Sequence, residues 1–242
     1  VRVVSHEGYG HDLAEALRDE MRLEPLLVAE LRGAPGSDTF ADRPDYDDIE
    51  RRCVARMLLH FDGERGLVRE QVAPDGTPID SPEGRLLNPG HAVEAAWFLA
   101  EVAARAGDAG LEADAFAMME GALDLGWDPE HGGLLYFLDA DGYSPTQLEW
   151  SMKLWWPHCE AMIGTLIAWR RTGEARWWER FDRIATWTMD RFPDPEQGEW
   201  FGYLTREGEV SQRFKAGPYK GFFHVPRALW MCERLLGAAG TE

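Results

Sequence analysis

The sequence predicts an all-α protein, an α/α toroid of helix pairs with short β-hairpins on one rim. Two observations support this prediction. A turn of the form Asp-x-x-x-Gly recurs every 66 residues, and the stretches between its copies have helical apolar periodicity. A unit of two helices and a hairpin cannot bury its apolar faces alone, so neighbouring units must stack. An open solenoid would show the same period.

The repeat is defined by two turns at a fixed offset, each present in three copies. The first turns are Asp62–Gly66, Asp128–Gly132 and Asp194–Gly198. Each leads into a short apolar or aromatic run, and the second turns follow at Asp75-Gly76, Asp141-Gly142 and Glu207-Gly208. The order of turn, strand, turn and strand predicts a small hairpin in each copy. The expected hairpins span 66–72, 133–138 and 199–205.

Helices are expected on both sides of these turns. The predicted segments are 12–31, divided by Pro25; 46–60, after a Pro/Gly/Asp loop over 34–45; 89–106 with 111–126; 157–171 with 175–191; and 226–236. Six units of this length would need roughly 400 residues. We therefore expect residues 1–242 to form a single α/α-barrel domain that is partial, with the incomplete end at the N-terminus.

Composition narrows the classes of function. The 25 Lys and Arg against 43 Asp and Glu give a net charge of −18, which argues against nucleic acid or an anionic membrane as a partner. Cys53, Cys159 and Cys232 are odd in number and lack metal-site spacing, so we expect reduced thiols in a cytoplasmic protein. No apolar run reaches membrane-spanning length.

The unusual residues gather where the chain enters three predicted inner helices, at 88–97, 153–163 and 220–231. Asn88 fits a helix N-cap and Pro89 the first helical position. A helix from there places His91, Glu94 and Trp97 at i, i+3 and i+6, on one face. All three segments should open at one rim, so their polar and aromatic side chains are predicted to share one cavity.

The second and third segments supply complementary chemistry. Trp155 and Trp156 offer flat faces for the apolar side of a sugar ring, and Glu160 can bind a hydroxyl or orient a histidine. In the third segment His224 and Arg227 are at i, i+3. His91 and His224 lie 133 residues apart, close to two repeat lengths, which predicts that both face the same cavity. Histidine suits proton transfer at neutral pH.

Other aromatic and imidazole side chains have simpler interpretations. His158 could enter the site or could pack in the core, and both alternatives stay open. His6, His11 and His60 have no partner pattern and are expected at the surface, and Trp177, Trp178 and Trp187 are expected to be structural. No metal is predicted, because no ligand spacing accompanies the two candidate histidines.

Four motifs carry a family resemblance: Asn88-Pro-Gly-His-Ala-Val-Glu-Ala-Ala-Trp97, Lys153-Leu-Trp-Trp-Pro-His-Cys-Glu-Ala-Met162, Glu199-Trp-Phe-Gly-Tyr203 and Lys220-Gly-Phe-Phe-His-Val-Pro-Arg227. They resemble the N-acylglucosamine 2-epimerase family over residues 46–238. The run Pro145-Thr-Gln-Leu-Glu-Trp150 is more similar to the N-acyl-D-glucosamine 2-epimerase branch than to the cellobiose 2-epimerases.

The resemblance implies an (α/α)6 barrel and an isomerase that interconverts N-acyl-D-glucosamine and N-acyl-D-mannosamine by removing and returning the C2 proton. It implies acid and base roles for His91 and His224. The residues expected to line the sugar site are Glu94, Trp156, Glu160 and Arg227, to which the spacing analysis adds Trp97 and Trp155. The resemblance also implies a homodimer, no required cofactor, and ATP as an allosteric modulator.

Three alternatives to this function remain. The first is another aldose 2-epimerase or an aldose–ketose isomerase of the same family. The second is an inverting glycosidase on the same kind of toroid, for which Glu94 and Glu160 could serve as the two carboxylates. The third is a truncated, non-catalytic sugar-binding or interaction protein, because a fold does not by itself give activity.

Overall fold

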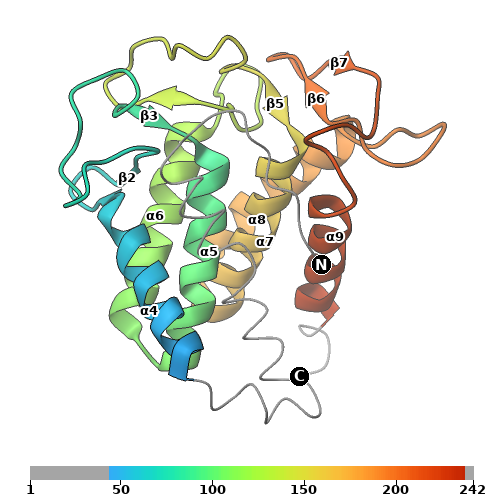
Figure 1. The fold of residues 1–242 in the computed structure, drawn as a ribbon. Coiled ribbons are helices and arrows are strands. Elements are labelled where there is room, and N and C mark those ends of the chain that lie inside the picture. Colours follow the sequence, from blue (N-terminus) through green and yellow to red (C-terminus); the bar gives the residue numbers. More distant parts are fainter. Residues whose placement is uncertain (1–43, 238–242) are drawn as a thin grey trace.

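The computed structural model describes residues 44–237, and its helices lie close to the predicted positions (Figure 1). The helices are α4 (Pro44–Leu59), α5 (Pro89–Ala106), α6 (Ala109–Gly126), α7 (Trp155–Thr172), α8 (Ala175–Arg191) and α9 (His224–Gly237). The all-α class is confirmed. The helix predicted over 12–31 and most of the loop predicted over 34–45 lie outside the described residues, as do His6 and His11. None of the described helices combines the length and hydrophobicity of a membrane span.

The helices form two layers. In the inner layer α5 packs against α7, and α7 packs against α9; α6 and α8 cover α5 and α7 from outside. The strands all lie at one end of the helices, at the top of Figure 1, where the chain enters α5, α7 and α9. The predicted architecture of stacked helix pairs with strands on one rim is therefore confirmed.

The start of α5 follows from its sequence. The Asn88 side chain accepts a hydrogen bond from the backbone N–H of His91 at 3.1 Å, and Pro89 occupies the first turn. The helix ends at Gly107 in the left-handed conformation, with φ 67°. This cap fixes His91 in the first turn of the helix, at the rim.

The repeated turns are built in a similar way in all three copies. The side chains of Asp128 and Asp194 each accept hydrogen bonds from the backbone N–H groups two and three residues later, and that of Asp62 accepts one from the N–H three residues later. Each turn ends in a glycine at φ between 66° and 72°, which a side chain would disfavour. The 66-residue repeat is thus confirmed at the level of individual hydrogen bonds.

The strands pair differently from the prediction. They are β1 (Phe61–Asp62), β2 (Leu67–Val68), β3 (Leu86–Leu87), β4 (Leu138–Asp139), β5 (Lys153–Leu154), β6 (Tyr203–Leu204) and β7 (Val210–Gln212). In the sheets, β1 pairs with β2, β3 with β4, and β5 with β6, which also pairs with β7. Only the third copy forms its hairpin of named strands as predicted, β6 with β7, so the prediction of one such hairpin per copy is wrong.

The pairing has a physical reason. The segment that enters each inner helix is apolar and buried, and it finds its hydrogen-bond partner in the rim strand of the next repeat. The pair Leu87↔Leu138 corresponds to Lys153↔Leu204, with both strands displaced by one 66-residue period. These cross-repeat pairs place the entries of α5 and α7 side by side at the rim.

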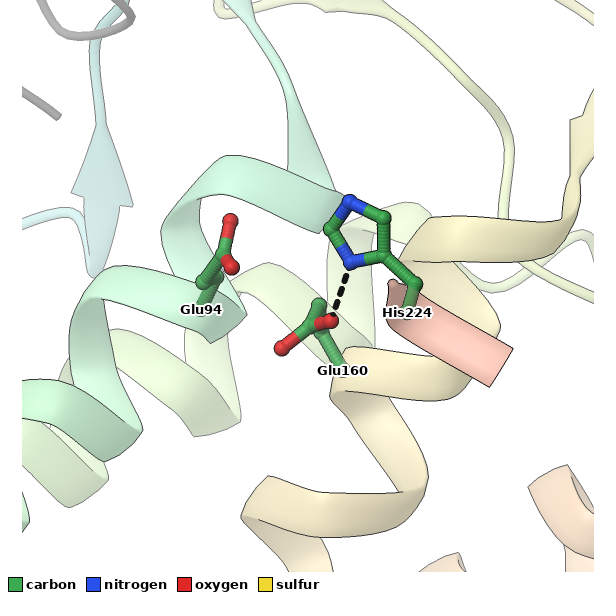
Figure 2. Close-up of side chains that lie close together, drawn as sticks. All are labelled: Glu94, Glu160 and His224. Carbon is green, nitrogen blue, oxygen red and sulfur yellow. Dashed lines mark hydrogen bonds and ion pairs between the residues drawn. The ribbon is translucent and has the colours of Figure 1, made fainter. Parts of the chain in front are cut away.

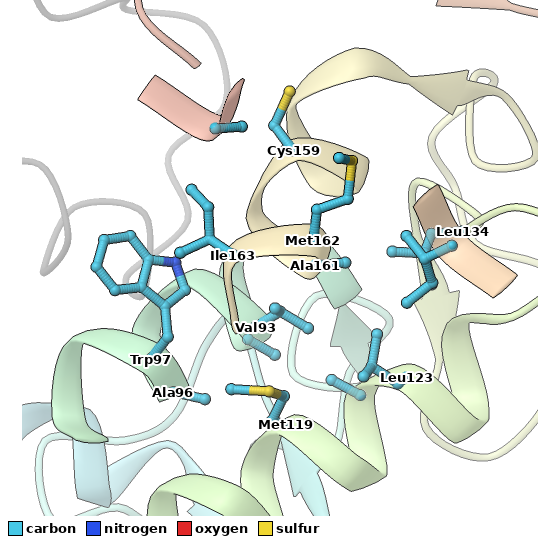
Figure 3. Packing of buried hydrophobic residues seen from close by; sticks show 14 of the residues in the cluster. Val93, Ala96, Trp97, Met119, Leu123, Leu134, Cys159, Ala161, Met162 and Ile163 are labelled. Atoms are coloured by element: carbon cyan, nitrogen blue, oxygen red, sulfur yellow. The ribbon is translucent and has the colours of Figure 1, made fainter. Parts of the chain in front are cut away.

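The core lies between the two helix layers. Figure 3 shows Val93 of α5, Met119 of α6 and Ile163 of α7 meeting in it, and all three are fully buried. Trp177 and Trp187 of α8 are buried as expected, and Trp178 packs against Trp169. Burial of this continuous apolar surface is the main stabilising term for such a layer.

Two histidines belong to the core. The expectation that His60 lies at the surface is wrong: its side chain is buried and its Nδ1 is 2.8 Å from the Arg69 carbonyl, because the chain folds back after α4. His158 is fully buried beneath the rim. Its Nε2 accepts from the Leu134 N–H, its Nδ1 donates to the Leu154 carbonyl, and its ring stacks on Trp187. His158 is therefore structural.

Candidate active site

A cavity of about 470 Å³ opens at the rim above the inner helices. Its described lining comes from the first turns of α5, α7 and α9 and from the rim strands and loops. The lining residues are His91, Glu94, Tyr136, Glu149, Met152, Leu154, Trp155, Trp156, Tyr203, Gln212, Tyr219 and His224. The predicted histidine pair is thus brought to one cavity from α5 and α9.

His91 is held by a buried carboxylate. Its Nδ1 lies 3.0 and 3.1 Å from the two carboxylate oxygens of Glu70, which follows β2. A carboxylate only accepts hydrogen bonds, so the proton of a neutral His91 resides on Nδ1. This arrangement leaves the lone pair on Nε2.

His224 is held in the same way by a different carboxylate. Its Nδ1 is 2.6 Å from Oε1 of Glu160, which is fully buried in α7. Figure 2 shows the ring above Glu160 with its second nitrogen directed away from the carboxylate. The cavity therefore has two imidazoles whose Nε2 atoms can accept a proton and whose Nδ1 atoms are fixed by carboxylates.

Both histidines flank one indole. The Trp156 ring lies 4.9 Å from the His91 ring and 5.8 Å from the His224 ring, measured between centroids. Its position depends on Gly90, where a Cβ would come within 2.6 Å of the Trp156 ring. The first turn of α5 thus allows Trp156 to lie between the two histidines.

A layer of charge lies beneath the cavity. The Arg227 guanidinium donates from Nη2 to Glu160 at 2.6 Å and to Glu94 at 2.8 Å, across three helices. Burial opposes ionisation of Glu160, but Arg227 and His224 outweigh it and lower the pKa of this carboxyl. Burial likewise opposes the charge on Arg227, but the two carboxylates raise its pKa. Glu160 is therefore an anion able to stabilise a protonated His224.

The same side chains form a group with metal-ligand chemistry. Glu94, Glu160 and His224 lie close together (Figure 2). Each offers one possible ligand atom, and the three atoms lie within 4.8 Å of one another. Arg227 already bridges the two carboxylates, and Nδ1 of His224 faces Glu160 with its proton. A cation would have to displace the guanidinium, so these residues do not fit a metal.

The predicted site residues divide into two layers. His91, Glu94, Trp155, Trp156 and His224 line the cavity. Below them lie Glu160, Arg227 and Trp97, which do not belong to the described lining. The prediction that Trp97 contacts the substrate is corrected, because its indole is fully buried and donates from Nε1 to Glu160 at 3.0 Å.

A second buried ion pair supports the entry to α7. Lys153 is fully buried and donates from Nζ to Asp128 at 3.0 Å, and Arg206 donates to the same carboxylate at 2.8 Å. Burial lowers the pKa of Lys153 to about 8. The contact ties β5, which directly precedes the Trp155-Trp156 pair, to the repeated turn at 128–132.

Similarity to known proteins identifies the family of this chain. The sequence pattern described as N-acylglucosamine 2-epimerase (GlcNAc 2-epimerase) matches residues 30–228. This chain belongs to the N-acylglucosamine 2-epimerase family. It is 45% identical over 229 residues to the N-acylglucosamine 2-epimerase of Mus musculus, covering 93% of this chain and 54% of that protein. The chain spans about half the length of the curated relatives it matches.

Solved structures agree on the fold of this family member. A D-mannose isomerase structure aligns with a TM-score of 0.70 at 18% identity, covering 90% of this chain and 56% of that one. The cellobiose 2-epimerase of Spirochaeta thermophila aligns with a TM-score of 0.68 at 21% identity, covering 90% and 53%. These similarities support the α/α-barrel type of fold predicted from the repeat.

Several residues around the candidate site of this N-acylglucosamine 2-epimerase family member were not predicted. Glu70 was missed because it lies 21 residues before its histidine, in a separate rim segment; its only signal is a carboxylate at the end of an apolar run. The lining residues that were not predicted come from irregular loops and short strands: Tyr136, Glu149, Met152, Leu154, Tyr203, Gln212 and Tyr219. Helical spacing carries no information about such segments.

Proposed function

We propose that this protein is a sugar 2-epimerase that interconverts N-acyl-D-glucosamine and N-acyl-D-mannosamine. The observation that carries the proposal is the pair of histidines at one cavity. The Nδ1 of each histidine is hydrogen-bonded to a buried carboxylate, and the two rings flank Trp156. Family membership and the names of the mammalian relatives support the choice of sugar.

The reaction requires two opposite proton transfers at one carbon. The C1 aldehyde of the open-chain sugar acidifies the C2 proton. Nε2 of one histidine takes that proton, the C2–H electron pair forms the C1–C2 double bond of an enolate, and the charge moves to the C1 oxygen. The other histidine, protonated, returns a proton to the opposite face of C2. Atoms balance and the sugar is neither oxidised nor reduced overall.

The surrounding charges suit this chemistry. Glu94, Glu160 and Arg227 together carry one negative charge, so protonation of His224 neutralises the group. A buried anion next to an imidazole favours the imidazolium that forms in the reaction. Trp156 offers a ring face beside both bases, which suits the apolar face of a sugar.

The arrangement disfavours the glycosidase alternative. An inverting glycosidase needs a carboxylic acid of raised pKa that can protonate the leaving group. Glu94 and Glu160 are both bound by Arg227, and the pKa of Glu160 is lowered. The two histidines would have no role in that reaction.

Epimerisation in heavy water tests the proposal. The full chain is incubated with N-acetyl-D-mannosamine in D₂O, and the sugars are followed by proton NMR. We expect N-acetyl-D-glucosamine with one solvent deuteron at C2 and none elsewhere on the carbon skeleton. The His91→Ala, His224→Ala double variant is the control and should leave the C2 proton in place.

Two results would overturn the proposal. A product that retains the original C2 hydrogen would exclude proton exchange with solvent. Binding of the sugar by calorimetry without any C2 exchange would favour a non-catalytic sugar-binding protein. The homodimer and the response to ATP stay predictions, to be measured by sedimentation and by turnover with and without nucleotide.

A further inference from the structure

We propose that Trp97 is a positioning residue that acts through Glu160 on His224, and so serves only one of the two proton transfers. This inference rests on the proposed epimerase function. It assigns Trp97 a role beneath the cavity in place of the substrate contact that its spacing predicted.

The two oxygens of Glu160 have separate partners. Oε2 accepts the indole N–H of Trp97 at 3.0 Å, whereas Oε1 faces Nδ1 of His224 and Nη2 of Arg227, both at 2.6 Å. The carboxylate is fully buried, so no solvent replaces a lost donor. The indole thus fixes the rotation of the carboxylate that presents Oε1 to His224.

The indole ring also supports Arg227. The Arg227 guanidinium carbon lies 5.4 Å from the centre of the Trp97 ring, within the range of a cation–π contact. A phenylalanine at position 97 would keep an aromatic ring beside the guanidinium but would lose the N–H. The Trp97→Phe variant therefore isolates the hydrogen bond to Glu160.

The effect should be confined to one histidine. His91 is oriented by Glu70, a different carboxylate from a different part of the rim. Loss of the Trp97 N–H leaves Oε2 of Glu160 without that donor, so the carboxylate rotates and His224 is no longer held as the single Nδ1–H tautomer. The orientation of His91 does not depend on that carboxylate.

The kinetic test compares exchange at C2 for each epimer separately, in D₂O, with the full chain. The His224→Ala variant identifies the epimer whose C2 proton His224 removes. For that epimer Trp97→Phe should slow exchange about tenfold, the low end of the effect of a hydrogen bond to a charged group. Exchange of the other epimer and KM should change less than about twofold.

Trp177→Phe is the matched control. Trp177 is also fully buried, on α8, and its indole nitrogen has no hydrogen-bond partner in the described part of the chain. This variant loses the same volume without losing a hydrogen bond, so neither exchange rate should change. Equal slowing of both epimers in Trp97→Phe, or slowing matched by Trp177→Phe, would overturn the inference.

A second readout does not need turnover. Nitrogen-15 NMR of labelled histidine reports the tautomer of His224, assigned with the His224→Ala variant. At neutral pH we expect His224 to carry its proton on Nδ1 in the wild-type protein and to be a mixture of tautomers in the Trp97→Phe variant. An unchanged tautomer would refute the positioning role. Absence of C2 exchange in the unchanged protein would instead refute the epimerase function, so the two failures are distinguishable.

Discussion

Replacing Glu160 with glutamine should damage both stability and catalysis, because three donors converge on this one buried carboxylate. Arg227, His224 and Trp97 all donate to it. A glutamine of the same shape has one acceptor oxygen and places an amide N–H₂ against a donor. Removing one partner of a buried ion pair costs about 3–5 kcal/mol. Arg227 keeps Glu94, so we expect the lower end, about 3 kcal/mol.

The lowered pKa of Glu160 determines how this loss of stability depends on pH. The pKa of Glu160 is lowered in the folded protein from the model-peptide value of 4.5. Its stabilising contribution is therefore complete above the unfolded-state pKa and is lost as the pH falls towards the lower folded-state pKa. The stability difference between the unchanged protein and Glu160→Gln should be largest near pH 7 and should shrink below about pH 4.5.

Urea unfolding followed by tryptophan fluorescence measures this difference at pH 7 and pH 4. Glu94→Gln is the control, because Glu94 lines the cavity and, within residues 44–237, makes a single hydrogen bond, accepted from Arg227 at 2.8 Å. We expect the free energy of unfolding of that variant to fall by about 1 kcal/mol. Turnover of Glu160→Gln should fall about a hundredfold, because His224 loses its anionic partner. Equal losses in the two variants, or a difference that grows in acid, would refute this account.

Two further predictions concern the frame of the site. Burial lowers the pKa of His158 to about 3. Between about pH 6.5 and pH 3, this histidine is therefore protonated in the unfolded chain but neutral in the folded chain. The free energy of unfolding should therefore fall by up to about 1.4 kcal/mol per pH unit on acidification. Urea unfolding over a pH series should show that the His158→Gln variant lacks this contribution. Equal slopes of stability against pH in the two proteins would contradict the prediction. Gly90→Ala should displace Trp156 and reduce kcat/KM at least about tenfold. Gly237→Ala is the control, because its Cβ would meet nothing within 4 Å, and it should leave kcat/KM unchanged. Full activity of Gly90→Ala would contradict the prediction and show that Trp156 tolerates the shift.

Local sequence signals predicted the helices and the place of the site. Asn88 and Pro89 define the start of α5, and the repeated aspartate and glycine turns define the period, because each acts through its own backbone neighbours. The period also predicted that His91 and His224 face one cavity. Such signals work because caps and turns are decided within a few residues.

Contacts between repeats were beyond the reach of these signals. Strands two residues long have no periodicity to analyse, so the pairing of β3 with β4 was not predicted. Glu70 and Trp97 belong to the site only through partners 21 and 63 residues away. Trp97 shares a helix face with His91 and Glu94, but its place one turn deeper puts it under the cavity rather than on its wall.

The most direct test of the two-base site is the exchange of each epimer's C2 proton in single-histidine variants. His91→Ala and His224→Ala should each lower kcat for epimerisation by roughly 10²–10⁴-fold, the range for loss of a positioned acid or base. In D₂O each variant should still exchange the C2 proton of only one epimer, and the two variants should prefer opposite epimers. Epimerisation at near-normal rates in both variants would contradict the assignment of His91 and His224 as the two bases.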